Sequence, residues 1–144
     1  MQEAARSLGL QAHVLHASST GEIDAAFGRL VALRAGGLVV GIDPFLTNQD
    51  AQIVALAARH AVPTIYGWRE LPFAGGLMSY GTSLADSYRQ VGVYVGRILK
   101  GEKPTELPVQ QAVRLELIVN LNTARALGLT FPITLLGRAD EFIE

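Results

Sequence analysis

Apolar residues recur along this chain in two patterns, at helical spacing and in short continuous runs, and the two patterns alternate. The longest helical pattern covers residues 84–99, where one face carries Leu84, Tyr88, Val91, Val95, Ile98 and Leu99. Ser83 precedes it as a helix N-cap, Gly101 follows it as a stop, and Pro104 forbids continuation. The pattern predicts one long amphipathic helix, with Tyr88 packed in the core.

Short apolar runs between the helical stretches predict buried strands. We expect strands over residues 10–16, 38–42, 64–66, 77–80 and the end of 109–120. Ser19 and Glu22 form a capping box ahead of a helix that ends near Gly36, and helices are also expected after residue 47 and over the last part of the chain. Alternation of helix and strand predicts an α/β fold with an open parallel sheet.

Composition narrows the class of protein. The 144 residues are 49% hydrophobic, enough for a globular core, and contain no cysteine, which excludes disulfides and thiolate metal sites. Twelve basic and thirteen acidic residues are spread without runs, so no electrostatic footprint for nucleic acid is present. No stretch reaches the roughly 18 apolar residues of a membrane span.

The candidate binding residues follow the predicted strands. In open α/β sheets, ligands bind at the carboxyl ends of strands, where connections part around a crevice. Three strand ends therefore supply candidate ligand-binding residues: Asp43 and Phe45, then Tyr66, Trp68 and Glu70, then Tyr80, Thr82 and Ser83. Together they offer aromatic faces, carboxylates and hydroxyls for a small polar or aromatic solute. We expect Asp43→Ala and Tyr66→Ala to weaken binding with little loss of stability.

Structural roles compete with binding at these positions. Asp43 before Pro44 is also a common strand-ending turn, Tyr66 and Trp68 also suit an interface between lobes, and Arg69 and Glu70 also suit a surface ion pair. His13 and His16 alternate to opposite faces of a strand, which argues against a metal site. No nucleophile, zinc or phosphate-loop motif is present, so the sequence predicts no catalysis and no cofactor.

Several short motifs occur in the order found in one family. They are Gly41-Ile42-Asp43-Pro44-Phe45, the helix exit Ile98-Leu99-Lys100-Gly101-Glu102-Lys103-Pro104, and Leu117-Ile118-Val119-Asn120 ahead of Thr123-Ala124-Arg125-Ala126-Leu127-Gly128. This order resembles the ABC-transporter substrate-binding family that includes the tryptophan and tyrosine binding proteins, a branch of the type I periplasmic binding proteins. The resemblance implies two lobes that close on a small organic solute and dock on an ABC permease in the periplasm.

One departure from the family pattern concerns the solute. Pro44 and Phe45 follow Asp43 where the resemblance leads us to expect a polar residue. The solute is therefore expected to be either amino-acid-like or an aromatic or branched carboxylate.

The resemblance also implies a division of the chain, because family members are about twice this length. We expect residues 1–68 to be a second-lobe βαβ segment that lacks its first strand, 69–76 to connect the lobes, and 77–144 to contribute to the first lobe and supply returning helices. Sheets left incomplete in this way predict a homodimer, and they predict that this chain alone binds the solute feebly or not at all.

Two other classes of protein fit the same residues. The ligand-sensing core of LacI-type transcription regulators resembles the same fold, and an upstream helix-turn-helix would distinguish it. A non-catalytic interaction domain would instead use exposed Trp68 and Phe73 as contact residues.

Overall fold

The computed structural model describes residues 2–110 and 114–144, and the chain divides into two compact units, residues 1–35 and 36–144. The first unit holds helices α1 (Gln2–Ser7) and α2 (Thr20–Ala32). Gly9 ends α1 with φ 69°, as expected of a left-handed stop. Ser19 caps α2 by accepting from the backbone N–H of Glu22.

The capping box of α2 reaches one residue further back than expected. The Glu22 carboxylate accepts from the backbone N–H of Ser18 at 2.7 Å, and this bond lowers the pKa of Glu22. At its other end α2 stops at Ala32, ahead of the glycines, and Arg34 takes the left-handed conformation with φ 50°. The predicted end near Gly36 is therefore too late by about one turn.

The predicted strand over residues 10–16 is wrong, because these residues form neither helix nor strand. A strand is stabilised by hydrogen bonds to a neighbouring strand. Within described residues 2–35 the regular elements are two helices, so an extended segment there has no partner for a ladder.

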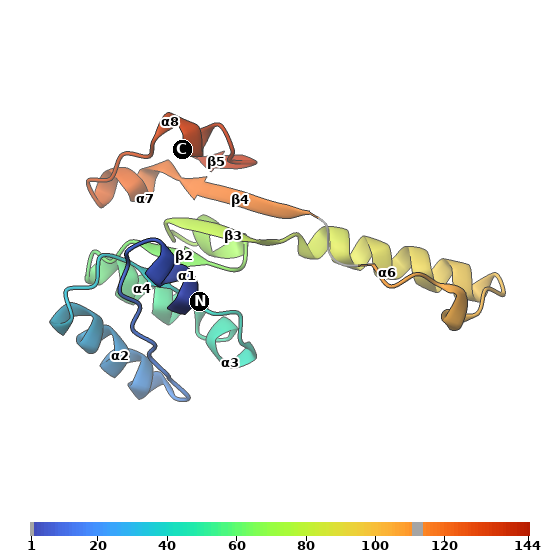
Figure 1. The fold of residues 1–144 in the computed structure, drawn as a ribbon, viewed down its shortest axis with the longest axis horizontal. Helices are drawn as coiled ribbons and strands as arrows, with labels where there is room; N and C mark the ends of the chain where they lie inside the picture. Colours follow the sequence, from blue (N-terminus) through green and yellow to red (C-terminus); the bar gives the residue numbers. More distant parts are fainter. Residues whose placement is uncertain (1, 111–113) are drawn as a thin grey trace. The chain divides into compact units, whose positions relative to one another are not determined.

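The second unit is built on a five-stranded sheet with the order β1-β2-β3-β4-β5 (Figure 1). The strands are β1 (Leu38–Val39), β2 (Thr64–Tyr66), β3 (Met78–Thr82), β4 (Leu115–Asn120) and β5 (Glu141–Ile143). All neighbours are parallel except β3 and β4, which are antiparallel. The predicted α/β fold with a parallel sheet is confirmed, except that the pair β3 and β4 is antiparallel.

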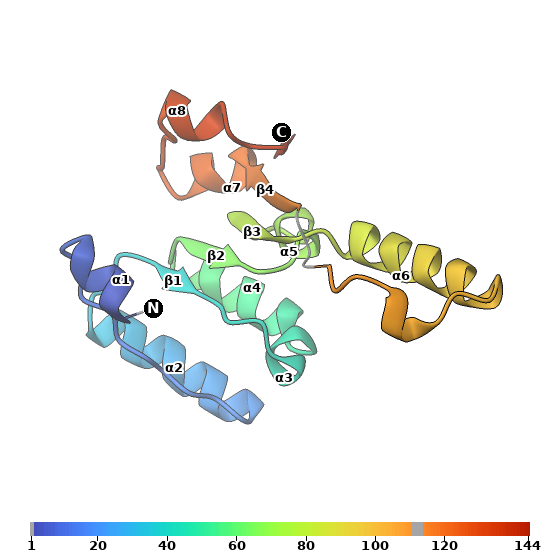
Figure 2. The same ribbon diagram turned by 45° about the vertical axis from the view of Figure 1, so that its right-hand side comes forward.

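Helices connect the strands of this sheet. Figure 2 follows the chain from β1 through α3 (Pro44–Thr47) and α4 (Asp50–Arg59) to β2, and from β4 through α7 (Leu121–Ala126) and α8 (Ile133–Leu136) to β5. A short helix α5 (Glu70–Phe73) joins β2 to β3. The buried apolar side chains of this unit include Ile53, Leu56, Leu71, Ile118 and Val119.

Two segments in the second half of the chain differ from expectation. Strand β3 pairs with β2, Met78 beside Ile65 and Ser79 beside Tyr66, so residues 69–76 connect neighbouring strands of one sheet. The expected helix at the end of the chain stops at Leu136, and β5 follows it. Pairing with β4 prevails there over the helical spacing of the apolar residues. The division of the whole protein into lobes at residues 69–76 stays a prediction.

Helix α6 (Leu84–Leu99) has the predicted ends but not the predicted burial. Ser83 accepts from the backbone N–H of Asp86, and Gly101 ends the helix region with φ 102°. Figure 1 shows residues 100–110 returning along α6, where the hydroxyl of Tyr94 donates to the carbonyl of Pro108. Yet no residue of α6 is buried, and Tyr88, expected in the core, is 72% exposed. Its apolar face is uncovered in the described part of the chain.

Candidate functional site

The carboxyl ends of β1, β2 and β3 meet through glycine contacts. A Cβ atom on Gly81 would overlap the carbonyl oxygen of Gly67 and lie 2.9 Å from its carbonyl carbon, and a Cβ on Gly67 would overlap the side chain of Ile42. Only glycine allows this approach of backbone to backbone. It brings the segments that carry Asp43, Trp68 and Tyr80 to one edge of a single sheet, whereas the expected division into lobes placed residues 77–80 in the other lobe.

Asp43 and Trp68 are linked through helix α3. Asp43 is exposed and caps α3, its Oδ1 accepting from the backbone N–H groups of Phe45 and Leu46 at 2.8 and 3.2 Å. At the other end of α3, the hydroxyl of Thr47 donates to the carbonyl of Asp43 and accepts from the indole N–H of half-buried Trp68. Because Asp43 is a cap, Asp43→Ala should cost about 1 kcal/mol of stability, contrary to the sequence-based expectation.

Tyr66 lies inside the unit and not on its surface. The residue is 2% exposed, its ring approaches Gly76, and its hydroxyl is buried without a hydrogen-bond partner. Burial raises the pKa of Tyr66 to about 12. The neighbouring Thr64 opposes this rise only in part and makes its own hydrogen bond to the carbonyl of Val62. Because Tyr66 is buried, we expect Tyr66→Ala to lower the stability, contrary to the sequence-based expectation.

One carboxylate lies near Tyr66, because the charge of Asp50 adds to the rise that burial causes in the pKa of Tyr66. Burial, and next the charge of Glu70, raise the pKa of Asp50, which begins helix α4. Glu70 is exposed at the start of α5. Glu70 therefore lies close enough to Asp50 for its charge to act on that carboxyl group.

Arg69 ties the end of β2 to β4 and β5. Its guanidinium donates to Glu116 at 3.0 Å and to Glu141 at 2.5 Å, and it lies 5.8 Å from the centre of the Phe73 ring. The Glu116 side chain is only 10% exposed, and its other oxygen lies 3.6 Å from Arg114. Arg69 therefore forms ion pairs with two carboxylates that are distant in the sequence, and not the suggested pair with Glu70.

The other candidates differ in how accessible they are. Tyr80 is exposed on β3, Phe45 and Thr82 are half-buried, and Ser83 is buried with its hydroxyl engaged in capping α6. Tyr80, Phe45 and Thr82 can therefore contact a solute directly. Ser83 and Tyr66 are buried and are not accessible to a solute.

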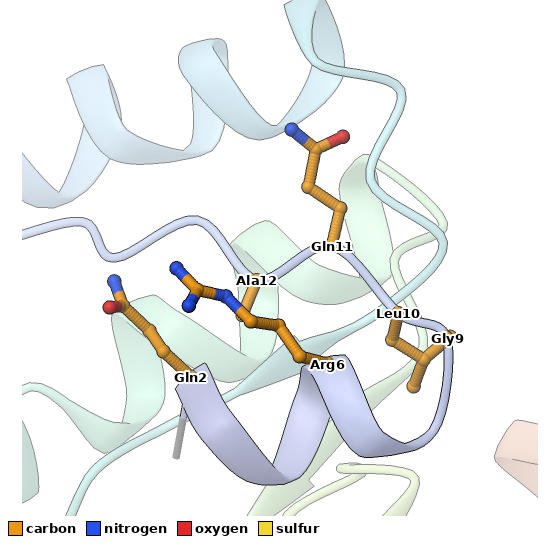
Figure 3. A pocket seen from close by; sticks show the side chains of 6 residues that line it. All are labelled: Gln2, Arg6, Gly9, Leu10, Gln11 and Ala12. Carbon is orange, nitrogen blue, oxygen red and sulfur yellow. The ribbon is translucent and has the colours of Figure 1, made fainter.

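An open hollow of about 500 Å³ lies in the first unit, away from the candidate residues in sequence. It is lined by Gln2, Arg6, Gly9, Leu10, Gln11 and Ala12, and Figure 3 shows the side chains of Gln2 and Arg6 leaving the same side of α1. All six residues come from one short stretch, and no predicted site residue is among them.

The described residues offer neither a metal site nor a membrane-spanning helix. Among residues 2–110 and 114–144, no group of three or more histidine, aspartate or glutamate side chains could hold a metal ion. None of the helices that the structure describes combines the length and hydrophobicity needed to span a membrane.

The sequence-profile comparison identifies the family. The profile described as "ABC transporter substrate binding protein" matches residues 1–143. The chain belongs to this family. The resemblance drawn from the short motifs is thereby confirmed, and because the ABC substrate-binding family is non-catalytic, the expectation of no enzyme is confirmed with it. No curated protein matches the chain.

Solved structures of similar fold include ABC-type binding proteins. A conserved domain protein from Vibrio cholerae is 23% identical with a TM-score of 0.85, and an ABC domain from Streptococcus pneumoniae in complex with L-Trp is 24% identical with a TM-score of 0.85. A ligand-free, open substrate-binding protein with adhesive properties from Clostridium difficile is 20% identical with a TM-score of 0.69.

The structural matches extend over nearly all of this chain but over only about half of each matched chain. The three cover 98%, 99% and 99% of this chain and 47%, 49% and 47% of their own chains, respectively. This ABC substrate-binding family member therefore spans about half the length of the solved structures that it matches.

Proposed function

We propose that this chain forms one wall of the solute-binding cleft in the substrate-binding protein of an ABC importer. The solute is a small organic molecule, either amino-acid-like or an aromatic or branched carboxylate. The observation that carries the proposal is the family match over residues 1–143. The glycine-mediated meeting of three strand ends supports the place of the site, since α/β sheets bind ligands there.

The accessible candidates suit such a solute. Asp43 offers a carboxylate to an ammonium group, the aromatic faces of Phe45, Trp68 and Tyr80 offer an apolar surface, and Thr82 offers a hydroxyl. Glu70 adds a second carboxylate at the start of α5. The pneumococcal ABC domain was solved with L-Trp, which makes aromatic amino acids the first solutes to test.

The only tryptophan of the chain reports on this site, so solute binding can be measured by its emission. We expect phenylalanine, tyrosine or leucine to change the emission of Trp68 saturably, with weak affinity because one wall leaves much of the solute in water. L-Trp would be measured by calorimetry. Asp43→Asn is the informative variant, because its side-chain oxygen can still cap α3 while the charge is lost.

Asp43→Asn should weaken binding of amino-bearing solutes about 10-fold or more and leave the melting temperature nearly unchanged, a charged hydrogen bond contributing about 1.5–3 kcal/mol. A solute that binds wild type and Asp43→Asn equally would place the site elsewhere. If no amino acid or carboxylate binds at millimolar concentration, the proposed solute class is wrong.

We also propose that the protein acts in the periplasm, where its closed form docks on an ABC permease. The family supports this location and partner. A pull-down with detergent-solubilised permease, with and without solute, tests the docking.

A homodimer is the proposed assembly of this chain. Helix α6 exposes its apolar face, and its charged residues Asp86, Arg89 and Arg97 lie on the other side by helical spacing. Strand β1 is the last strand at one edge of the sheet and exposes Val39. A two-fold contact would cover such surfaces in both copies, and an obligate interface of this kind buries about 2,000 Å² or more in total.

Light scattering at micromolar concentration tests the dimer. We expect a dimer for the wild type and a monomer for Val91→Glu, because the new charge would be buried in the contact. Val93→Glu is the matched control, since Val93 is similarly exposed, 54% against 58%, but lies on the opposite side of α6 by helical spacing. A monomeric wild type would contradict the assembly, and a dimer indifferent to Val91→Glu would place the contact on another surface.

A further inference from the structure

A chain of hydrogen bonds connects the only indole of the protein to the turn that holds Asp43. The indole N–H of Trp68 donates to Oγ1 of Thr47 at 3.3 Å, and this hydroxyl donates to the carbonyl of Asp43 at 2.9 Å. The first bond joins residues 21 positions apart, from the loop after β2 to the last residue of α3. Thr47 therefore links the segments that follow β1 and β2 through hydrogen bonds.

The direction of these bonds can be assigned from the groups alone. An indole nitrogen is a donor only, and a carbonyl oxygen is an acceptor only. A hydroxyl has one proton and two lone pairs, so Thr47 can satisfy both neighbours only by accepting from Trp68 while it donates to Asp43. Bonds aligned in this way polarise and strengthen one another.

The geometry points to Thr47 as a positioning residue for the aromatic wall of the site. We propose that its hydroxyl fixes the indole of Trp68 relative to the Asp43 turn, so that the crevice favours solutes with an aromatic body over aliphatic ones of similar charge. This inference rests on the proposed function for its ligand. The placement of the indole itself can be tested without any ligand.

Thr47→Val and Thr47→Ser form a matched pair. Valine has the shape of threonine without the hydroxyl, whereas serine keeps the hydroxyl. Helix α3 should survive in both, because the backbone N–H of Thr47 also donates to the carbonyl of Asp43 and the Asp43 cap is untouched. Circular dichroism and thermal melting of each variant check this.

The ligand-free measurement uses the single indole N–H resonance in a ¹⁵N–¹H spectrum of the full chain. In Thr47→Val we expect this resonance to shift and its exchange with water to quicken several-fold, and in Thr47→Ser we expect both to return toward wild type. An indole signal that is the same in Thr47→Val and wild type would overturn the proposal.

The ligand measurement compares phenylalanine with leucine. We expect the ratio of their affinities to fall by roughly 3- to 10-fold in Thr47→Val, the range that the loss of one hydrogen bond gives, and to recover in Thr47→Ser. If the indole resonance of Thr47→Val shifts while the ratio of phenylalanine to leucine affinity stays unchanged, the role of Thr47 in selectivity is overturned. If neither solute binds the wild type, the proposed function fails for these solutes, and the indole resonance alone decides whether Thr47 holds Trp68.

Discussion

Replacement of Gly81 by alanine is expected to destabilise the protein by about 3 kcal/mol or more, at or beyond the upper end of the usual cost of overpacking. The added methyl group would overlap the carbonyl oxygen of Gly67, which belongs to the backbone and cannot rotate away as a side chain can. Relief requires the ends of β2 and β3 to separate, which would also move Trp68. Urea denaturation of wild type and Gly81→Ala measures the loss.

Gly92→Ala is the matched control for this prediction. Gly92 lies inside α6, and a Cβ atom there would have nothing within 4 Å. Alanine in a helix interior is favoured over glycine by about 0.5–1 kcal/mol, so this variant should be slightly more stable than wild type. Equal stability of Gly81→Ala and wild type would show that the two strand ends do not approach as described.

The second large effect is expected at Tyr66, where removal of the ring and removal of the hydroxyl should act in opposite directions. Tyr66→Ala leaves a cavity in a 2% exposed position and should cost about 3–5 kcal/mol. Tyr66→Phe removes only the buried hydroxyl that has no partner, and should raise the free energy of unfolding by about 1 kcal/mol. Denaturant midpoints of the two variants check both signs.

The pH dependence of stability offers an independent check on Tyr66. A phenol whose pKa rises from 10.0 to about 12 on folding stays protonated in the folded state while the unfolded state loses its proton. The stabilising effect is complete below pH 10 and is lost as the pH rises toward 12, by roughly 2–3 kcal/mol. Tyr66→Phe should lack this alkaline loss, and an identical loss in both proteins would contradict the burial of the hydroxyl.

Elements with strong local signals could be predicted from the sequence. Helix α6 has its cap at Ser83 and its stop at Gly101 as expected, and the apolar run at residues 64–66 is a strand. The ends of β1 and β2 lie at one edge, as expected for parallel strands, whereas the place of β3 beside β2 was not predicted. In these cases the local sequence determines the backbone conformation, or the parallel strand order determines which ends of the strands lie together.

Features that depend on distant partners could not be predicted. Residues 10–16 have the alternation of a strand but no strand to pair with, and residues 141–143 have helical spacing but pair with β4. Arg69 bonds to carboxylates 47 and 72 residues away, although Glu70 is its neighbour. The expected strand over residues 77–80 ended before Gly81, so the close approach of the Gly67 and Gly81 backbones was not predicted either.

The exposure of α6 has a consequence for how the protein opens. A 16-residue helix has little stability of its own in water, because most helical stability in proteins comes from packing of the apolar face. No side chain of α6 is buried. In β4, by contrast, the apolar side chains of Leu117, Ile118 and Val119 and the amide of Asn120 are buried. The free energy of local opening should therefore be small along α6 and close to the global value along β4. In the isolated chain, amide hydrogens of α6 should exchange with solvent well before those of the sheet, and any partner that covers the helix should slow them selectively.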